Sequence, residues 1–128
     1  MTIESNPPRT LTTVVSWLAL VSALASVLYL AILIPTNRTM YERTLREFKV
    51  ELPAATIFLF KIPAAVFPIA AVFVATICGV VQYRFRGQGG AALFHMLVIV
   101  LCCVAFTTYR EVLMQPLFHL ILALHGER

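Results

Sequence analysis

Residues 34–56 read IPTNRTMYERTLREFKVELPAAT, the longest charged passage in a chain that is otherwise mostly apolar. Of the 128 residues, 60% are hydrophobic and only 12% are charged, whereas soluble domains carry roughly 25% charged residues. One uninterrupted apolar segment precedes this stretch, and further apolar segments follow it. We therefore expect an all-α integral membrane protein whose main water-exposed feature is residues 34–56.

The segment before the charged stretch, residues 11–34, contains no charged residue over 24 positions. As a helix it would extend about 36 Å, enough to cross a hydrocarbon core of roughly 30 Å with some tilt. We predict the first transmembrane helix here, preceded by a polar tail over residues 1–10. Four small residues at helical spacing would let another helix approach closely: Ala19, Ser22, Ala23 and Ser26.

A cleaved secretory signal is the alternative interpretation of this segment. Arg9 precedes the apolar run, and residues 23–25, ALA, have the small-x-small form of a cleavage site. Cleavage there would leave a mature chain that begins inside the remaining apolar run. We therefore favour a retained transmembrane helix.

The charged stretch itself has a helical pattern. Pro35 should end the first helix, because a proline inside a helix removes one backbone hydrogen bond. Beyond it, large apolar residues recur at i, i+4, i+7 and i+11, on a single helical face. This spacing predicts a short amphipathic helix over residues 36–52, held along the membrane surface because so short a helix is marginal alone in water. The apolar docking face would comprise Tyr41, Leu45, Phe48 and Leu52.

The same region resembles part of a known family. Ile34-Pro35 closes an apolar segment, Tyr41 and Phe48 follow, and residues 51–56, ELPAAT, lead into the next apolar segment. This order resembles the corresponding stretch of type II secretion F proteins, the inner-membrane platform proteins of type II secretion and type IV pilus assembly. The likeness is confined to one helix-loop-helix element within residues 12–83. It implies a bacterial inner-membrane scaffold that lacks catalytic residues and packs with itself and with partner subunits.

The next apolar segment, residues 54–83, is longer than a membrane crossing needs, and its prolines at positions 63 and 68 should kink it. Lys61 determines its depth, because a lysine at the bilayer centre costs roughly 3 kcal/mol. We therefore place the crossing near residues 64–82, with the Lys61 side chain reaching the interface.

The last part of the chain should hold one more crossing. A basic, glycine-rich turn over residues 84–90 leads to a third transmembrane helix over residues 91–109. Residues 112–124 would extend only about 20 Å as a helix, too short to cross. We predict for them an interfacial or re-entrant helix, or a kinked extension of the third helix. The expected single membrane domain thus has three transmembrane helices, an amphipathic loop helix and a C-terminal interfacial helix.

Few residues could carry chemistry. All six acidic residues are glutamates, which removes Asp-dependent calcium loops, Walker B carboxylates and Ser-His-Asp triads. The three cysteines lie in apolar segments without CxxC spacing, which is typical of packing residues. We therefore predict no catalytic, cofactor or metal site. His95 is a weak candidate for a pigment or haem ligand, and Lys61 is a candidate functional charge in a transport path.

The net charge of +4 is scattered over loops and termini, which favours anionic lipid headgroups over nucleic acid as the partner. The sequence predicts a non-enzymatic, multi-pass protein of the bacterial inner membrane. Its expected role is that of a structural or accessory subunit that packs with other membrane subunits or with itself. An oligomeric small transporter or channel is one alternative, and a pigment- or haem-associated subunit of an electron-transfer complex is another.

The charge pattern and the family resemblance predict opposite membrane orientations. Counting Lys and Arg alone, the positive-inside tendency places residues 34–56 in the cytoplasm. The family resemblance implies the periplasmic side instead. Both orientations stay open at this point.

Overall fold

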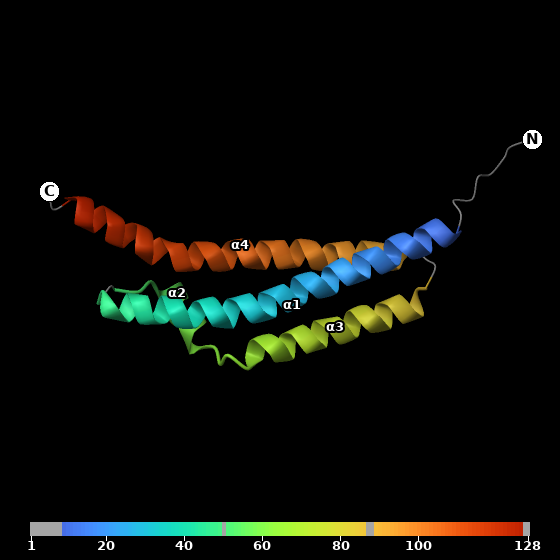
Figure 1. Ribbon diagram of the computed structural model, residues 1–128, viewed down its shortest axis with the longest axis horizontal. Helices are drawn as coiled ribbons and strands as arrows, with labels where there is room; N and C mark the ends of the chain where they lie inside the picture. Colours follow the sequence, from blue (N-terminus) through green and yellow to red (C-terminus); the bar gives the residue numbers. More distant parts are fainter. Residues whose placement is uncertain (1–8, 50, 87–88, 127–128) are drawn as a thin grey trace, which may run out of the picture.

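The computed structural model describes residues 9–49, 51–86 and 89–126. Within them lie the helices α1 (Arg9–Glu47), α2 (Ala54–Lys61), α3 (Val66–Arg84) and α4 (Gly89–Gly126), and these residues form no strand. The three long helices lie side by side in an elongated bundle, with α3 antiparallel to α1 and α4 (Figure 1). The predicted all-α fold is confirmed.

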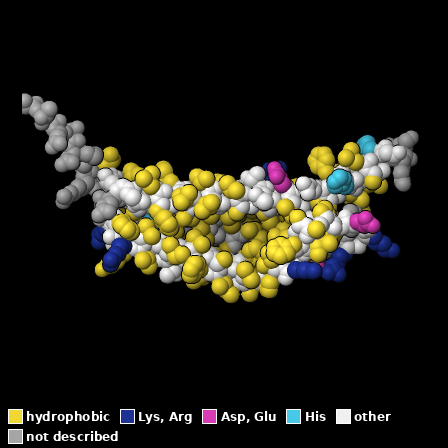
Figure 2. Space-filling model, turned by 180° about the vertical axis from the view of Figure 1, so that it is seen from behind, with side chains coloured by type: hydrophobic (Ala, Val, Ile, Leu, Met, Phe, Trp, Pro, Cys, Tyr) yellow, Lys and Arg dark blue, Asp and Glu magenta, His cyan; other side chains and the backbone are white. Residues whose placement is uncertain are grey.

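α1, α3 and α4 are long and apolar enough to cross a membrane. In Figure 2, apolar side chains cover the middle of the visible face, whereas Lys and Arg side chains gather toward its two ends. This distribution suits a bundle whose centre lies in hydrocarbon and whose cations lie at headgroup level. The chain therefore has the helices of a multi-pass membrane protein.

The prediction that Pro35 ends the first helix is wrong, because α1 continues through Pro35 to Glu47. Membrane helices tolerate proline where neighbouring groups and packing compensate for the lost hydrogen bond. Here α1 keeps packing against the bundle beyond the proline, since Leu45 is buried and the Tyr109 hydroxyl donates a hydrogen bond of 3.0 Å to the Ile34 carbonyl oxygen. Residues 36–47 are therefore the end of the first helix rather than a separate amphipathic helix.

α1 ends before the predicted boundary at residue 52. Lys49 has a φ of 51°, in the left-handed region, and its N–H bonds the Arg46 carbonyl oxygen at 3.3 Å. Helices commonly end with one left-handed residue, usually glycine, because this geometry satisfies carbonyls of the last turn. Phe48 and Leu52 therefore lie beyond the helix.

The predicted single helix over residues 54–83 is also wrong, because α2 and α3 occupy this segment as two helices. Ile62 is extended, with φ −66° and ψ 125°, as steric contact with the following proline favours, and this ends α2. Pro68 lies in the first turn of α3, where a backbone N–H has no helical partner to lose. The crossing placed near residues 64–82 corresponds to α3, which begins at Val66.

α4 runs without interruption through Arg110, Glu111 and Pro116, so residues 112–124 belong to the same helix as the third crossing. Figure 1 shows the C-terminal part of α4 turned away from the line of its first part. A proline within a helix is a usual cause of such a bend. Of the predicted alternatives for residues 112–124, the structure therefore has the extension of the third helix, and a separate interfacial or re-entrant helix is not formed.

Two predicted segments are only partly described. The polar tail over residues 1–10 is described only from Arg9, and the basic turn over residues 84–90 is described except for 87–88. At the start of this turn, Phe85 donates its N–H to the Val81 carbonyl oxygen at 3.0 Å and closes the end of α3.

A narrow core holds the bundle together. α1 contacts both α3 and α4 more extensively than these two contact each other, so α1 is the central helix. Between 11% and 22% of the residues in the most apolar window of each long helix are buried within the chain. Most of the surface of these helices is therefore open to lipid or to other membrane helices. The core cluster comprises Leu20, Ala23, Val27, Cys78 and Val98.

Candidate functional site

A buried polar cluster joins the three long helices near the start of α4. Gln82 Oε1 accepts a hydrogen bond of 2.7 Å from the Ser16 hydroxyl and lies 3.1 Å from His95 Nε2. The three side chains are buried, with exposed fractions of 1% for Ser16, 4% for Gln82 and 0% for His95. Because an unpaired polar group in hydrocarbon costs several kcal/mol, these contacts fix how the three helices align.

The contact between Gln82 and His95 joins α3 to α4. Gln82 Oε1 lies within hydrogen-bond distance of His95 Nε2, which donates to it in the tautomer that carries the proton on Nε2. Gln82 Nε2 and His95 Nδ1 then have no hydrogen-bond partner among the described residues. His95, the weak candidate for a pigment ligand, is therefore a buried contact between helices, and its Nε2 already bonds Gln82. Ser16 and Gln82 are not among the site residues predicted from the sequence. The signal that could have identified them is a polar residue within or at the end of an apolar segment, where an unpaired polar group is costly.

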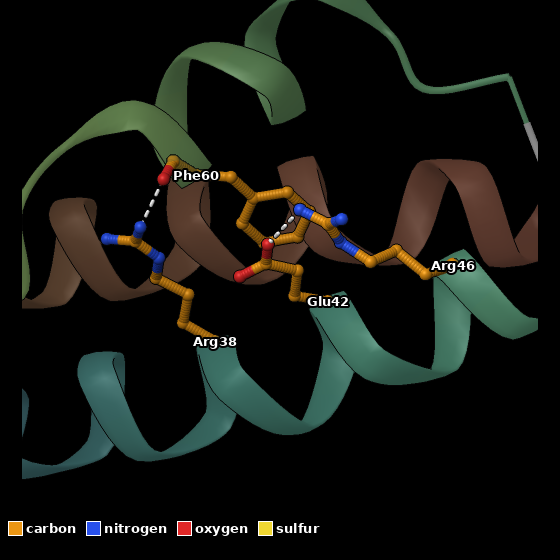
Figure 3. Close-up of polar contacts among 4 residues, drawn as sticks. All are labelled: Arg38, Glu42, Arg46 and Phe60. Atoms are coloured by element: carbon orange, nitrogen blue, oxygen red, sulfur yellow. Dashed lines mark hydrogen bonds and ion pairs between the residues drawn. The ribbon is translucent and has the colours of Figure 1, made fainter.

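A second set of polar contacts surrounds Arg38 in the C-terminal part of α1. Its guanidinium donates a hydrogen bond to the backbone carbonyl oxygen of Phe60, in the last turn of α2 (Figure 3). It donates a second to the carbonyl oxygen of Ile62, directly after α2. The last carbonyls of a helix have no partner within it, and a cation there also complements the helix dipole. Arg38 therefore fastens α2 to α1.

The other side of α2 is fixed to α4. Thr56, which is 0% exposed, donates its hydroxyl to the Val112 carbonyl oxygen at 3.1 Å. Lys61, the candidate functional charge, is the last residue of α2 and is exposed. It lines neither of the two grooves described below. At that position its charge complements the end of the α2 dipole.

The four residues expected on one amphipathic face lie in different surroundings. Leu45 is 1% exposed and belongs to the interior, and Tyr41 is half-buried on the same helix. Phe48 is 56% exposed in the turn after α1, and Leu52 is half-buried in the segment before α2. The single helical face is therefore not formed, because the helix ends before it is complete.

Nearby, Glu42 and Arg46 form an ion pair of 2.8 Å one helical turn apart (Figure 3). The Arg46 side chain is 78% exposed, so solvent screening leaves the pair only a few tenths of a kcal/mol, about the value of an i,i+4 pair.

The stripe of small residues on α1 divides between two environments. Ala19 and Ala23 are buried inside the bundle, with exposed fractions of 8% and 0%. Ser22 is exposed, and Ser26 is half-buried and donates its hydroxyl to the Ser22 carbonyl oxygen at 2.8 Å. One half of the stripe thus packs within the chain, and the other half faces outward.

Grooves open between the long helices, and two of them are formed by described residues of α1, α3 and α4. The larger, of about 430 Å³, lies between α3 and α4 with α1 as its floor, and is called here the α3–α4 groove. Figure 2 shows a hollow between two rows of apolar side chains. The smaller, of about 240 Å³, lies between α1 and α4 and has both polar and apolar walls; it is called the α1–α4 groove.

The described part of the chain contains no group of three or more His, Cys, Asp or Glu that could hold a metal ion. The cysteines are free thiols, with Cys78 buried, Cys102 half-buried and Cys103 exposed.

The helices and contacts define a small helical protein with three helices able to cross a membrane, fixed together by a buried polar cluster. A comparison with family models, with curated proteins and with solved structures finds no match to this chain. The resemblance to type II secretion F proteins therefore stays a prediction.

Proposed function

We propose that this chain is a non-catalytic accessory subunit of a larger assembly in the bacterial inner membrane, and that it joins the assembly through the α3–α4 groove. The observation that carries the proposal is the groove itself, an apolar hollow of about 430 Å³ along helices able to cross a membrane. A transmembrane helix of another subunit, or of a second copy, would occupy it.

The residues lining the groove favour a helix as the occupant. Lipid tails are as apolar as leucine, so membrane helices associate through close packing at small residues rather than through apolar burial alone. All three long helices contribute such residues to the groove, namely Ala31, Ala70, Ala71, Cys102 and Ala105. A partner helix could therefore bring its backbone close to the floor and both walls.

The polar contacts of the chain support a structural role. The Ser16, Gln82 and His95 side chains are engaged with each other, and none of them lines either groove. Arg38 and Thr56 are engaged in holding α2. The likeness to secretion platform proteins agrees with this role, because it implies work by packing with partner subunits.

Two adjacent native cysteines provide the test. Cys102 lines the groove, whereas its neighbour Cys103 is exposed outside it. Two variants would each keep one of these thiols, the other cysteines being replaced, and would carry a thiol-linked photo-crosslinker activated in native membranes. We expect a discrete protein adduct from Cys102 and no discrete adduct from Cys103, identified by gel shift and mass spectrometry.

A matched pair of substitutions checks that the groove is the contact. Ala105→Phe would fill the groove, whereas Val104→Phe adds the same ring at an exposed position outside it. The partner should be lost from mild-detergent preparations of Ala105→Phe and retained with Val104→Phe. Equal adducts from both cysteines, or a chain that stays a lone monomer in native nanodiscs, would contradict the proposal.

A further inference from the structure

The α1–α4 groove is built from two rows of residues spaced one helical turn apart. Its α1 wall comprises Tyr29, Leu33, Asn37 and Tyr41. The principal row of its α4 wall comprises Phe106, Arg110 and Met114. α1 and α4 run in the same direction (Figure 1), so Asn37 on α1 and Arg110 on α4 both lie further along the chain than the aromatic residues Tyr29 and Phe106. Asn37, Tyr41 and Arg110 therefore lie toward the C-terminal half of the two walls, where Leu113 and Met114 add apolar contacts.

The apolar end of the groove is formed by aromatic rings. The Tyr29 and Phe106 rings contact each other, with their centroids 6.5 Å apart and their planes tilted by 51°. Leu33, one turn further along α1, continues the apolar wall. This end lies beside residues 11–34, the uncharged part of α1, and hence at the level of the hydrocarbon.

The other end of the groove has an unbalanced positive charge. Arg110 lines it, and the guanidinium has no ion pair with any described residue. Its neighbour Glu111 does not line the groove, as expected because adjacent residues do not face each other on a helix. The Asn37 amide and the Tyr41 hydroxyl add neutral hydrogen-bonding groups, and no acidic residue lines the groove.

The length of the groove matches one leaflet of a bilayer. From Tyr29 to Tyr41, α1 rises about 18 Å, and half of a hydrocarbon core of roughly 30 Å is about 15 Å. The polar end also lies near Arg38, the first charged residue after the apolar run. The groove thus extends from hydrocarbon depth to headgroup depth.

We propose that the α1–α4 groove binds one anionic phospholipid. Its phosphate would contact Arg110 beside Asn37 and Tyr41, and its acyl chains would lie toward Tyr29 and Phe106. A phospholipid fits better than free phosphate, because free phosphate would leave the apolar half of the groove unfilled. This site does not depend on the accessory-subunit role or on the α3–α4 groove.

Native mass spectrometry of the purified full chain, with added phosphatidylglycerol or phosphatidylcholine, tests the site. Arg110→Gln removes the cation while keeping a long polar side chain. Arg43→Gln is the matched control, because Arg43 is exposed on α1 and lines neither groove. Loss of one charge-assisted hydrogen bond should weaken phosphatidylglycerol binding about tenfold in Arg110→Gln, and Arg43→Gln should bind as the unaltered chain does.

Two further measurements separate the proposal from simple surface charge. Leu33→Trp keeps every cation but fills the apolar half, and it should also lose the lipid while retaining its helical circular dichroism. Inorganic phosphate should not displace the lipid. Equal weakening in Arg110→Gln and Arg43→Gln, displacement by inorganic phosphate, or undiminished lipid binding in Leu33→Trp would each overturn the proposal.

Discussion

Replacing Gln82 with leucine should destabilise the bundle, because Gln82 is the residue that the other two members of the buried cluster share. Its Oε1 accepts from Ser16 at 2.7 Å and lies 3.1 Å from His95 Nε2. In the variant, the Ser16 hydroxyl can bond a carbonyl of its own helix. Neutral His95 keeps one ring N–H in either tautomer, and without Gln82 this donor would be unpaired in a side chain that is 0% exposed.

The magnitude follows from these contacts. An unpaired buried donor costs about 1–3 kcal/mol, and hydrogen bonds between membrane helices average about 0.6 kcal/mol. The substitution also removes Gln82 Nε2, which has no partner among the described residues, and this offsets part of the loss. The net effect should be about 1–2 kcal/mol, a change of roughly 5- to 30-fold in the folding equilibrium.

A triple variant, Ser16→Ala, Gln82→Leu and His95→Leu, supplies the control. Replacing every partner with an apolar group leaves no unpaired donor, so most of the lost stability should return. Trp17, the single tryptophan, lies next to Ser16 and gives a fluorescence signal for reversible unfolding in mixed micelles. An unpaired His95 donor would be excluded as the cause if Gln82→Leu were as stable as the unaltered chain, or if the triple variant were as unstable as Gln82→Leu.

Three other perturbations address the end of the bundle that contains α2. Arg38→Gln should raise amide hydrogen exchange in α2 about tenfold, because two carbonyl oxygens lose a charged donor, and Arg43→Gln should leave that exchange unchanged. Lys49→Gly should raise stability by about 1 kcal/mol in thermal melting, since glycine adopts the left-handed φ of 51° without strain, whereas a gain of equal size from Lys49→Ala would contradict this cause. A cysteine introduced at Glu47 should be labelled by an impermeant maleimide only after spheroplasts are opened, and labelling of intact spheroplasts would place this end on the periplasmic side.

The three crossings could be predicted because hydropathy and length are properties of single segments. A run such as residues 11–34 carries its own signal, whatever it packs against. The prediction that the first helix ends at Pro35 was wrong because it also used only local sequence. The rule that proline ends a helix considers only the local backbone, whereas α1 continues because Leu45 and Tyr109 hold its far end to the bundle.

The polar contacts of the candidate sites could not be predicted, because they depend on how helices align. Ser16 and Gln82 are 66 positions apart in the sequence, and their contact requires α1 and α3 to pack antiparallel at one alignment. No contact of Arg38 was predictable from its position just after the first apolar segment. Its partners are carbonyls that become available only because the chain breaks at Ile62, and that break was predicted as a kink.

Lys61 adds one cation to the end of the bundle that already holds the C-terminal part of α1, and so bears on which end faces the cytoplasm. Arg38, Arg43, Arg46 and Lys49 lie on the last part of α1 and the turn after it, and Arg38 bonds the end of α2, which brings Lys61 to the same end. Arg84, at the end of α3, lies at the opposite end (Figure 1). The positive-inside tendency counts Lys and Arg near the ends of the crossings and gives acidic residues little weight, so Lys61 strengthens the case for a cytoplasmic position of α2.

In that orientation the α1–α4 groove lies in the cytoplasmic leaflet, where negative surface potential attracts cations such as Arg110. Labelling of Glu47→Cys from outside intact spheroplasts would reverse both conclusions together, and would move the proposed lipid site to the other leaflet.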